Sequence, residues 1–268
     1  NASDFFNTCA NKAPIGKEGW VVLFSRNADV DIYNQEKLKA IEKPEYSFNA
    51  VDYAKSGNPR DRAAMLNILK NLLVPPKLQL KEGSQVLLLV NLSLHLVNGT
   101  QGVVVGFEEV DIGEIRENTT GLTAKNKDLC ERGWARVNSK VDGSKKVTIP
   151  LVLWNGSTTP TRVYTHACSV EMHAFAGELE ELKDIAFREQ IPMKLAWALT
   201  IHKSQGMSLK KMHASLDTVF ANGQLYVALS RATCLEGLSL QNPINARLAM
   251  QSQAVIDFYQ RLETQTKQ

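Results

Sequence analysis

The sequence changes character at Leu78. From there to about Met172 it consists of short β-rich runs separated by Gly and Asn, which is typical of strands joined by short connections. The runs occupy residues 84–92, 102–110, 133–139, 145–154 and 161–170. Strands at this spacing predict a small closed barrel rather than another α/β layer. The polar, turn-rich residues 111–133 predict a long exposed loop.

The sequence on either side of this region favours an α/β fold. Residues 19–25 (GWVVLFS) form a continuous apolar run of the buried-strand kind, and residues 26–41 carry apolar side chains at roughly helical spacing. A strand that leads into a helix is the βα unit of a parallel sheet. Residues 59–73 predict a second helix, which the prolines at 75–76 end, and residues 176–190 also have helical composition.

Residues 191–209 (IPMKLAWALTIHKSQGMSL) predict a single helix, because Pro192 suits a first helical turn and Gly206 suits a helix exit. No acidic residue lies in 191–216, although this window holds Lys194, Lys203, Lys210 and Lys211. Hydroxyls and cations on one side of a helix suit a phosphate backbone. The alternative is that His202 is a hydrogen-bonded core residue and the lysines form a solvated face.

A second motif, GQLYVALSRA at 223–232, predicts a short helix with Asn222 as a plausible cap. Helical spacing places Gln224, Ala228 and Arg231 on one side. An arginine held at the edge of a cleft can neutralise charge that develops on a transferred phosphoryl group. The alternative is an ordinary surface arginine.

Net charge alone identifies no partner. The chain has 31 Lys and Arg residues and 28 Asp and Glu residues, which gives a formal charge of +3. An argument for a nucleic-acid partner therefore depends on local patches of positive charge. The four cysteines are scattered with no C-x-x-C pair, at Cys9, Cys130, Cys168 and Cys234. This spacing fits reduced thiols in an intracellular protein. No leader pattern and no run near the ~18 apolar residues of a membrane span is present, so we expect no membrane partner.

The sequence lacks a phosphate-binding loop. No G-x-x-x-x-G-K-[ST] pattern occurs between Asn1 and Gln268, and Gly16-Lys17 is followed by Glu18, which has no hydroxyl to hold magnesium. We therefore expect that this chain does not hold a nucleotide in the usual way by itself.

Taken together, the motifs resemble a known family. The string LAWALTIHKSQGMSL at 195–209, followed by GQLYVALSRA, is similar to the last two motifs of superfamily-one DNA helicases of the PIF type. Three earlier strings match the same family in the same order: LFSRNADVDIYN at 23–34, LKEGSQVLLLVNL at 80–92 and LVNGTQGVVVGFE at 96–108. The resemblance covers almost the whole chain.

The resemblance implies a domain organisation. Such helicases have two RecA-like domains with ATP between them, and this chain is similar to the second only, with a small Src-homology-three-like β-barrel inserted. It places residues 1–79 and 189–268 in the RecA-like parallel-sheet domain, and residues 80–188 in the inserted barrel with its long loop 111–133. The first domain, with the phosphate loop, the magnesium-binding acid and the catalytic base, is absent.

The resemblance also implies roles for particular residues. Arg231 is expected to be catalytic by reaching the γ-phosphate of ATP across the cleft, with Gln224 nearby. Gln205, Gly206 and Gln224 are expected to bind ATP together with Arg231, and Gln205 and Gly206 are expected to couple the state of the nucleotide to the grip on DNA. The residues expected to contact single-stranded DNA are Thr200, His202, Lys203, Ser204, Asn91 and Asn98.

The implied cofactors are ATP and Mg²⁺, held mainly by the absent first domain, so the chain alone is expected to hydrolyse no ATP. The implied partners are single-stranded, forked or G-quadruplex DNA and the missing N-terminal RecA-like domain. Family members translocate 5′-to-3′ in replication, repair, recombination and telomere maintenance, which implies a nuclear or mitochondrial location if the source is eukaryotic.

Two readings from other classes remain open. In the first, the chain is a non-catalytic nucleic-acid-binding module and the helix with Arg231 is structural. In the second, His166, Cys168 and His173 with distant Cys130 bind zinc, although their spacing matches no common zinc signature. We expect no metal site.

Overall fold

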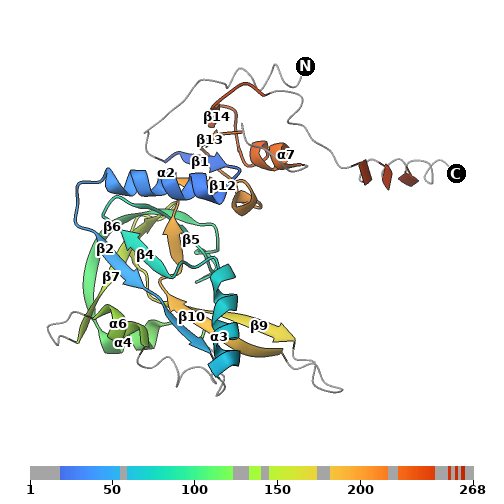
Figure 1. Cartoon of the computed structure of the whole chain (residues 1–268). Coiled ribbons are helices and arrows are strands. Elements are labelled where there is room, and N and C mark those ends of the chain that lie inside the picture. The colour runs from blue at the N-terminus through green and yellow to red at the C-terminus, as the bar shows by residue number, and fades with distance from the viewer. Residues whose placement is uncertain are drawn as a thin grey trace. The chain divides into compact units, whose positions relative to one another are not determined.

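A computed structural model gives the fold of the chain (Figure 1). The structure describes residues 19–54, 59–122, 133–139, 145–173, 182–216, 223–244, 253–254, 257–258 and 261–262. The chain divides into two compact units: unit 1 comprises Asn1–Lys39 and Ala196–Gln268, and unit 2 comprises Ala40–Leu195. The boundaries predicted at residues 80 and 188 therefore both fall inside unit 2.

Unit 1 is built on a four-stranded sheet in the order β12-β1-β13-β14, and every neighbouring pair is parallel. The strands are β1 (Val21–Phe24), β12 (Ala198–Thr200), β13 (Met212–Ala214) and β14 (Leu238–Leu240). Helix α2 (Asn27–Lys39) follows β1 directly, as the sequence predicted. The buried side chain of Asn34 attaches α2 to β12, since its amide donates to the Ala198 carbonyl at 3.0 Å and accepts from the Ala198 N–H at 2.9 Å.

The single helix predicted for 191–209 is wrong. The segment contains strand β11 (Met193–Leu195), strand β12 and the short 3₁₀-helix η2 (His202–Ser204). The residues from Ala196 to Ile201 are buried without interruption. A strand in a parallel sheet is covered on both faces and therefore gives a continuous apolar run, which periodicity alone does not separate from a buried helix.

Unit 2 contains a five-stranded antiparallel sheet in the order β11-β5-β6-β7-β8. Besides β11, its strands are β5 (Gln85–Leu88), β6 (Gln101–Asp111), β7 (Lys146–Trp154) and β8 (Thr161–Arg162). The register between β6 and β7 shifts between Val104 and Gly106, as at a bulge that bends a strand. Among the described residues the two end strands are not paired with each other, so closure into a Src-homology-three-like barrel stays a prediction.

Two smaller sheets complete unit 2. Strands β2 (Tyr46–Asn49) and β4 (Lys77–Leu80) form an antiparallel pair. Strands β3 (Val51–Ala54), β10 (Leu182–Gln190) and β9 (His166–His173) form a three-stranded antiparallel sheet with β10 in the centre. The helices in the described part of unit 2 are α3 (Pro59–Ile68), η1 (Leu69–Asn71), α4 (Ile112–Asn118) and α6 (Gly133–Asn138).

Three predictions in unit 2 need correction. The helix predicted over 176–190 is strand β10 from Leu182 on, because pairing with β3 and β9 outweighs helical composition. The strand predicted at 133–139 is helix α6, whose Trp134 is fully buried and lies parallel to Phe48 with ring centroids 6.3 Å apart. The loop predicted over 111–133 contains α4, while residues 123–132 lie outside the described part.

The core of unit 2 joins the five-stranded sheet to α4 and α6. It includes Val86, Leu88, Val104, Ile149 and Trp154, each at most 1% exposed. No helix in the described ranges is long and apolar enough to cross a membrane.

Candidate functional site

The candidate site begins where β12 ends. The N–H of Ile201 donates to the Phe24 carbonyl at 2.9 Å, so the turn 201–206 starts at the carboxyl end of the parallel sheet. Ligands of open α/β sheets bind outside this edge. Ile201 is fully buried, whereas His202, Lys203 and Gln205 are exposed. The turn therefore presents an imidazole, an ammonium and an amide to solvent.

The hydroxyls of this turn are used to hold its shape. Ser204 is fully buried and its Oγ donates to the Ile201 carbonyl at 2.7 Å. Thr200 is 4% exposed and its Oγ1 accepts from the Lys203 N–H at 3.3 Å. Both residues were predicted to contact DNA; in this structure they are buried and hydrogen-bonded within the turn, and the DNA contact stays a prediction. Gly206 leaves the turn with φ +82°, a left-handed conformation that glycine adopts without a Cβ penalty.

The structure brings the two sequence motifs together within unit 1. Helix α7 (Gln224–Leu229) begins after Gly223, and the predicted cap Asn222 lies outside the described residues. Beyond α7, the Arg231 carbonyl accepts from the Leu209 N–H at 2.8 Å, and the Leu209 carbonyl accepts from the Thr233 N–H at 3.1 Å. The segment after Arg231 thus runs beside the end of the first motif.

The Arg231 guanidinium adds a side-chain link to the same place. Its Nη1 donates to the Met207 carbonyl at 3.1 Å, its Nε to the Val227 carbonyl at 3.0 Å, and its Nη2 to Ser230 Oγ at 3.0 Å. The side chain is half-buried and its position is fixed by three contacts. Gln224, predicted to lie near it on the same face, is 3% exposed.

Asn91 and Asn98 lie in unit 2 and are close to each other. The Asn98 N–H donates to Asn91 Oδ1 at 2.7 Å, which closes the exposed loop between β5 and β6. At the tip of this loop Ser93 Oγ accepts from the N–H groups of His95 and Leu96, and Leu94 is 94% exposed. Asn91 therefore shapes the loop, whereas the Asn98 side chain is exposed.

The zinc hypothesis receives no support from the residues that can be placed. Cys130 and the side chain of His173 lie outside the described part. His166 Nδ1 is hydrogen-bonded to Thr120 Oγ1 at 2.8 Å, and burial lowers the His166 pKa. Burial raises the pKa of the Cys168 thiol to about 11, which disfavours the thiolate that a metal needs. The described ranges contain no group of three or more potential metal ligands.

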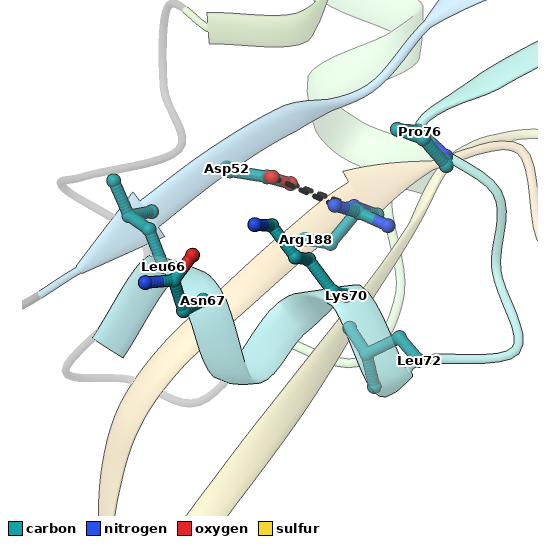
Figure 2. Close-up of a pocket in the computed structure, with 7 residues that line it drawn as sticks. All are labelled: Asp52, Leu66, Asn67, Lys70, Leu72, Pro76 and Arg188. Atoms are coloured by element: carbon teal, nitrogen blue, oxygen red, sulfur yellow. Dashed lines mark hydrogen bonds and ion pairs between the residues drawn. The ribbon is translucent and has the colours of Figure 1, made fainter. Parts of the chain in front are cut away.

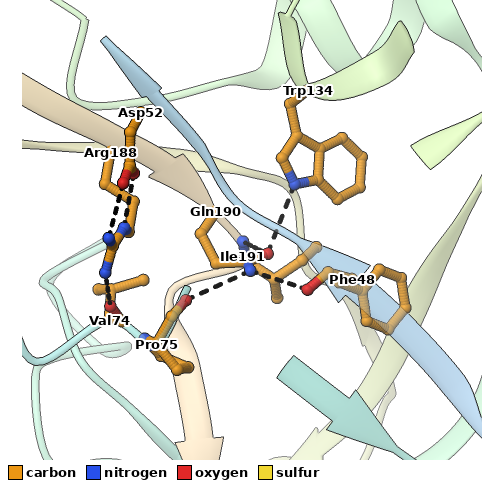
Figure 3. Close-up of polar contacts among 8 residues, drawn as sticks. All are labelled: Phe48, Asp52, Val74, Pro75, Trp134, Arg188, Gln190 and Ile191. Carbon is orange, nitrogen blue, oxygen red and sulfur yellow. Dashed lines mark hydrogen bonds and ion pairs between the residues drawn. The ribbon is translucent and has the colours of Figure 1, made fainter. Parts of the chain in front are cut away.

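Unit 2 contains a buried polar network that the sequence motifs do not include (Figure 3). Arg188 is 4% exposed, and its Nε and Nη2 donate to the two carboxylate oxygens of Asp52 at 2.7 and 2.8 Å. Its Nη1 donates to the Val74 carbonyl at 3.0 Å. The fork thus joins β10, β3 and the segment that precedes β4.

Gln190 makes the second part of the network. This fully buried amide donates to the Phe48 carbonyl at 3.0 Å, and it accepts from the Ile191 N–H at 2.9 Å and from Trp134 Nε1 at 3.4 Å. The signal in the sequence is the polar triplet at 188–190 directly before an apolar run. The triplet lies in a segment whose composition predicts a helix, so the alternation of its side chains across strand β10 is not apparent from the sequence.

Comparisons with known proteins agree with the resemblance. A family model described as the 2B domain of DNA helicase Pif1 matches residues 65–107. The ATP-dependent DNA helicase PIF1 of Emericella nidulans is 35% identical over 90% of this chain and 32% of its own length, and the human PIF1 is 35% identical over 84% and 28%. The chain thus spans about a third of the length of these relatives.

Solved structures show the same relationship. A crystal structure of Pif1 helicase from Candida albicans superimposes with a TM-score of 0.69 at 31% identity, covering 97% of this chain and 53% of that one. Bacteroides Pif1 bound to single-stranded DNA gives a TM-score of 0.62 at 22% identity, which shows the fold alone.

Proposed function

We propose that this chain, which is related to part of the Pif1 DNA helicases, is the second motor domain of an ATP-dependent 5′-to-3′ DNA helicase. The observation that supports this proposal best is the link between Arg231 and Met207. It connects a candidate nucleotide-sensing guanidinium to the end of the turn that presents His202 and Lys203. An element that touches DNA should be continuous with one that touches ATP in a motor that changes its grip.

The residues present fit one wall of a nucleotide site. The chain contains no phosphate loop, so Mg²⁺ and the β-phosphate would be held by another domain. Arg231 can supply the opposite wall, because a guanidinium has five N–H donors and three are used within the described residues. Two donors remain for phosphate oxygens. ATP with Mg²⁺ would supply the transferable phosphoryl group.

The turn 202–206 is proposed to hold the phosphate backbone of single-stranded DNA. Lys203 supplies a charge and His202 and Gln205 supply further hydrogen bonds, while buried Thr200 and Ser204 keep the turn in place. Movement of Arg231 toward a phosphate would strain or break its bond to Met207. The turn would then change shape at its C-terminal end, so that the nucleotide state would alter how tightly the turn binds DNA.

Binding of labelled single-stranded oligothymidylate tests the DNA contact. We expect Lys203→Glu to weaken binding at least tenfold and to reduce its salt dependence, since a phosphate contact is replaced by repulsion. Lys39→Glu makes the same charge change on an exposed residue of unit 1 at the end of α2 and should change affinity less than twofold. Equal losses in the two variants would show attraction by overall charge and would contradict a contact at this turn.

ATP hydrolysis separates the motor from a non-catalytic DNA-binding module. The module would bind DNA through the same exposed turn but would need no role for Arg231. Addition of this chain to a phosphate-loop domain should raise DNA-dependent ATP hydrolysis if the motor proposal holds. An unchanged rate with intact DNA binding would favour the module.

A further inference from the structure

Buried polar side chains reach different elements in the two units. In unit 2, Arg188 and Asp52 bind each other in the wall of a pocket of about 440 Å³, which no residue of the sequence motifs lines (Figure 2). In unit 1, the side chain of Asn34, which is 6% exposed, instead binds the strand that leads into the exposed turn 201–206. Asn34 therefore connects helix α2 to the candidate site.

Strand β12 is an end strand of the parallel sheet in the described part of unit 1, and only one of its edges is paired with another strand. On the paired edge, the Trp197 carbonyl accepts from the Val22 N–H at 2.8 Å. Further along the same edge, the Ile201 N–H donates to the Phe24 carbonyl at 2.9 Å. Because the peptide groups of a strand alternate between its two edges, the N–H and C=O of Ala198 point away from β1.

The Asn34 amide takes the place of a neighbouring strand at this outer edge. A side-chain amide combines a carbonyl acceptor with N–H donors, as a peptide group does. Its Nδ2 donates to the Ala198 carbonyl at 3.0 Å and its Oδ1 accepts from the Ala198 N–H at 2.9 Å. Ala198 is fully buried, so removal of the amide takes a partner from two main-chain groups that lie away from water.

These two bonds lie close to the exposed turn along the chain. Thr200 follows Ala198 by two residues in the same strand, and its Oγ1 accepts from the Lys203 N–H at 3.3 Å. A displacement of β12 at Ala198 therefore moves the acceptor that holds Lys203. Helix α2 contacts β12 along its length and gives Asn34 a fixed support (Figure 1).

We propose that Asn34 is a positioning residue for the turn 201–206. It fixes the outer edge of β12 and thereby the place at which Lys203 is presented to solvent. Asn34 acts through Ala198 and needs no contact with a ligand of the turn. The consequence for DNA binding rests on the proposed function, whereas the effect on the shape of the turn does not.

Amide NMR of the isosteric variant Asn34→Asp tests the effect on the turn without DNA. A carboxylate still accepts from the Ala198 N–H but places an oxygen without a proton against the Ala198 carbonyl. We expect the amide signals of Lys203 and Gln205 to shift. Asn34→Ala, which removes both bonds and adds no charge, should shift them too and serves as the second variant if Asn34→Asp does not fold.

Leu240→Ala is the control for a general loss of stability. Leu240 is fully buried on β14, the other end strand of the same sheet, so its truncation leaves a cavity in unit 1 far from β12 in the strand order. It should leave the Lys203 and Gln205 signals in place. The proposal is overturned if these signals stay in place in both Asn34 variants, or if Leu240→Ala shifts them as far.

Binding of labelled oligothymidylate then separates this proposal from the proposed function. Folded Asn34→Ala should bind at least fivefold more weakly than the unmodified chain, whereas Leu240→Ala should stay within twofold. Shifted amide signals with unchanged affinity would uphold the positioning role of Asn34 and contradict a DNA contact at the turn. The loss of binding in Asn34→Ala cannot come from charge repulsion, because this variant adds no charge.

Discussion

Arg231 Nη1 donates a hydrogen bond to the main-chain carbonyl of Met207 at 3.1 Å. The two residues are 24 positions apart in the chain. Three side-chain contacts and the neighbouring main-chain bonds between Leu209 and the 231–233 segment fix the guanidinium beside the end of the exposed turn. A displacement of either residue therefore alters the position of the other through this single hydrogen bond.

Removal of one partner of the Asp52–Arg188 pair should strongly destabilise unit 2. Asp52→Ala leaves a guanidinium with a side chain only 5% exposed without its carboxylate. Removal of one partner from a buried pair typically costs ~3–5 kcal/mol, and we expect a loss of about 3 kcal/mol in the free energy of unfolding because Asp52 is partly exposed.

The control for this variant is Lys43→Ala in the same unit. It removes the ion pair between Lys43 and Glu82, whose side chains are 46% and 48% exposed. Exposed pairs contribute ~0–1 kcal/mol, so denaturant unfolding should show a small change. Equal losses of unfolding free energy in the two variants would mean that the buried Asp52–Arg188 pair matters no more to stability than an exposed ion pair.

Gln190 should be similarly sensitive. Gln190→Leu keeps an apolar side chain of comparable size but leaves the Phe48 carbonyl and the Ile191 N–H without their partner. Each buried group left unsatisfied costs ~1–3 kcal/mol, so we expect a total loss of about 3 kcal/mol. Gln79→Leu on β4, where the amide pairs with Glu45 at an exposed site, should cost less than ~1 kcal/mol by the same measurement. An unchanged free energy of unfolding in Gln190→Leu would contradict a stabilising role for these hydrogen bonds.

The two described cysteines should differ in reactivity. Burial raises the pKa of Cys168 to about 11, whereas Cys234 is exposed. In a variant with Cys9 and Cys130 replaced by serine, iodoacetamide at pH 8 should modify Cys234 first and leave Cys168 unmodified in the folded chain. Mass spectrometry of the labelled peptides measures this order, and equal labelling would contradict the burial of Cys168.

The raised pKa of Cys168 also predicts how the stability of the fold changes with pH. The folded pKa of Cys168 lies above the unfolded value of 9.0, so the unfolded chain loses this proton first as the pH rises. The contribution of Cys168 to stability is therefore complete below pH 9 and falls between pH 9 and about 11. Cys168→Ala should reduce the loss of thermal stability over this interval.

The parts of the fold that followed from sequence are those in which local and tertiary preferences agree. The run 19–25 and the helix after it were predicted because a continuous apolar run differs from apolar side chains at roughly helical spacing. The helix predicted over 191–209 was wrong because strands buried on both faces resemble a buried helix. Strand β10 was missed because its composition favours a helix. The motifs single out these residues in the sequence, but which of their side chains are buried and which are exposed depends on the conformation of the turn at 200–206.

The most direct measurement of the proposed function is DNA-stimulated ATP hydrolysis by the proposed two-domain motor with Arg231→Ala. We predict that turnover falls by about 10³-fold or more, the size typical of a lost arginine finger, while affinity for single-stranded DNA stays within a few-fold. Arg261→Ala, a substitution on an exposed arginine near the C-terminus, should leave turnover unchanged. Normal turnover by the Arg231 variant would contradict the assignment of this residue and with it the proposed composite site.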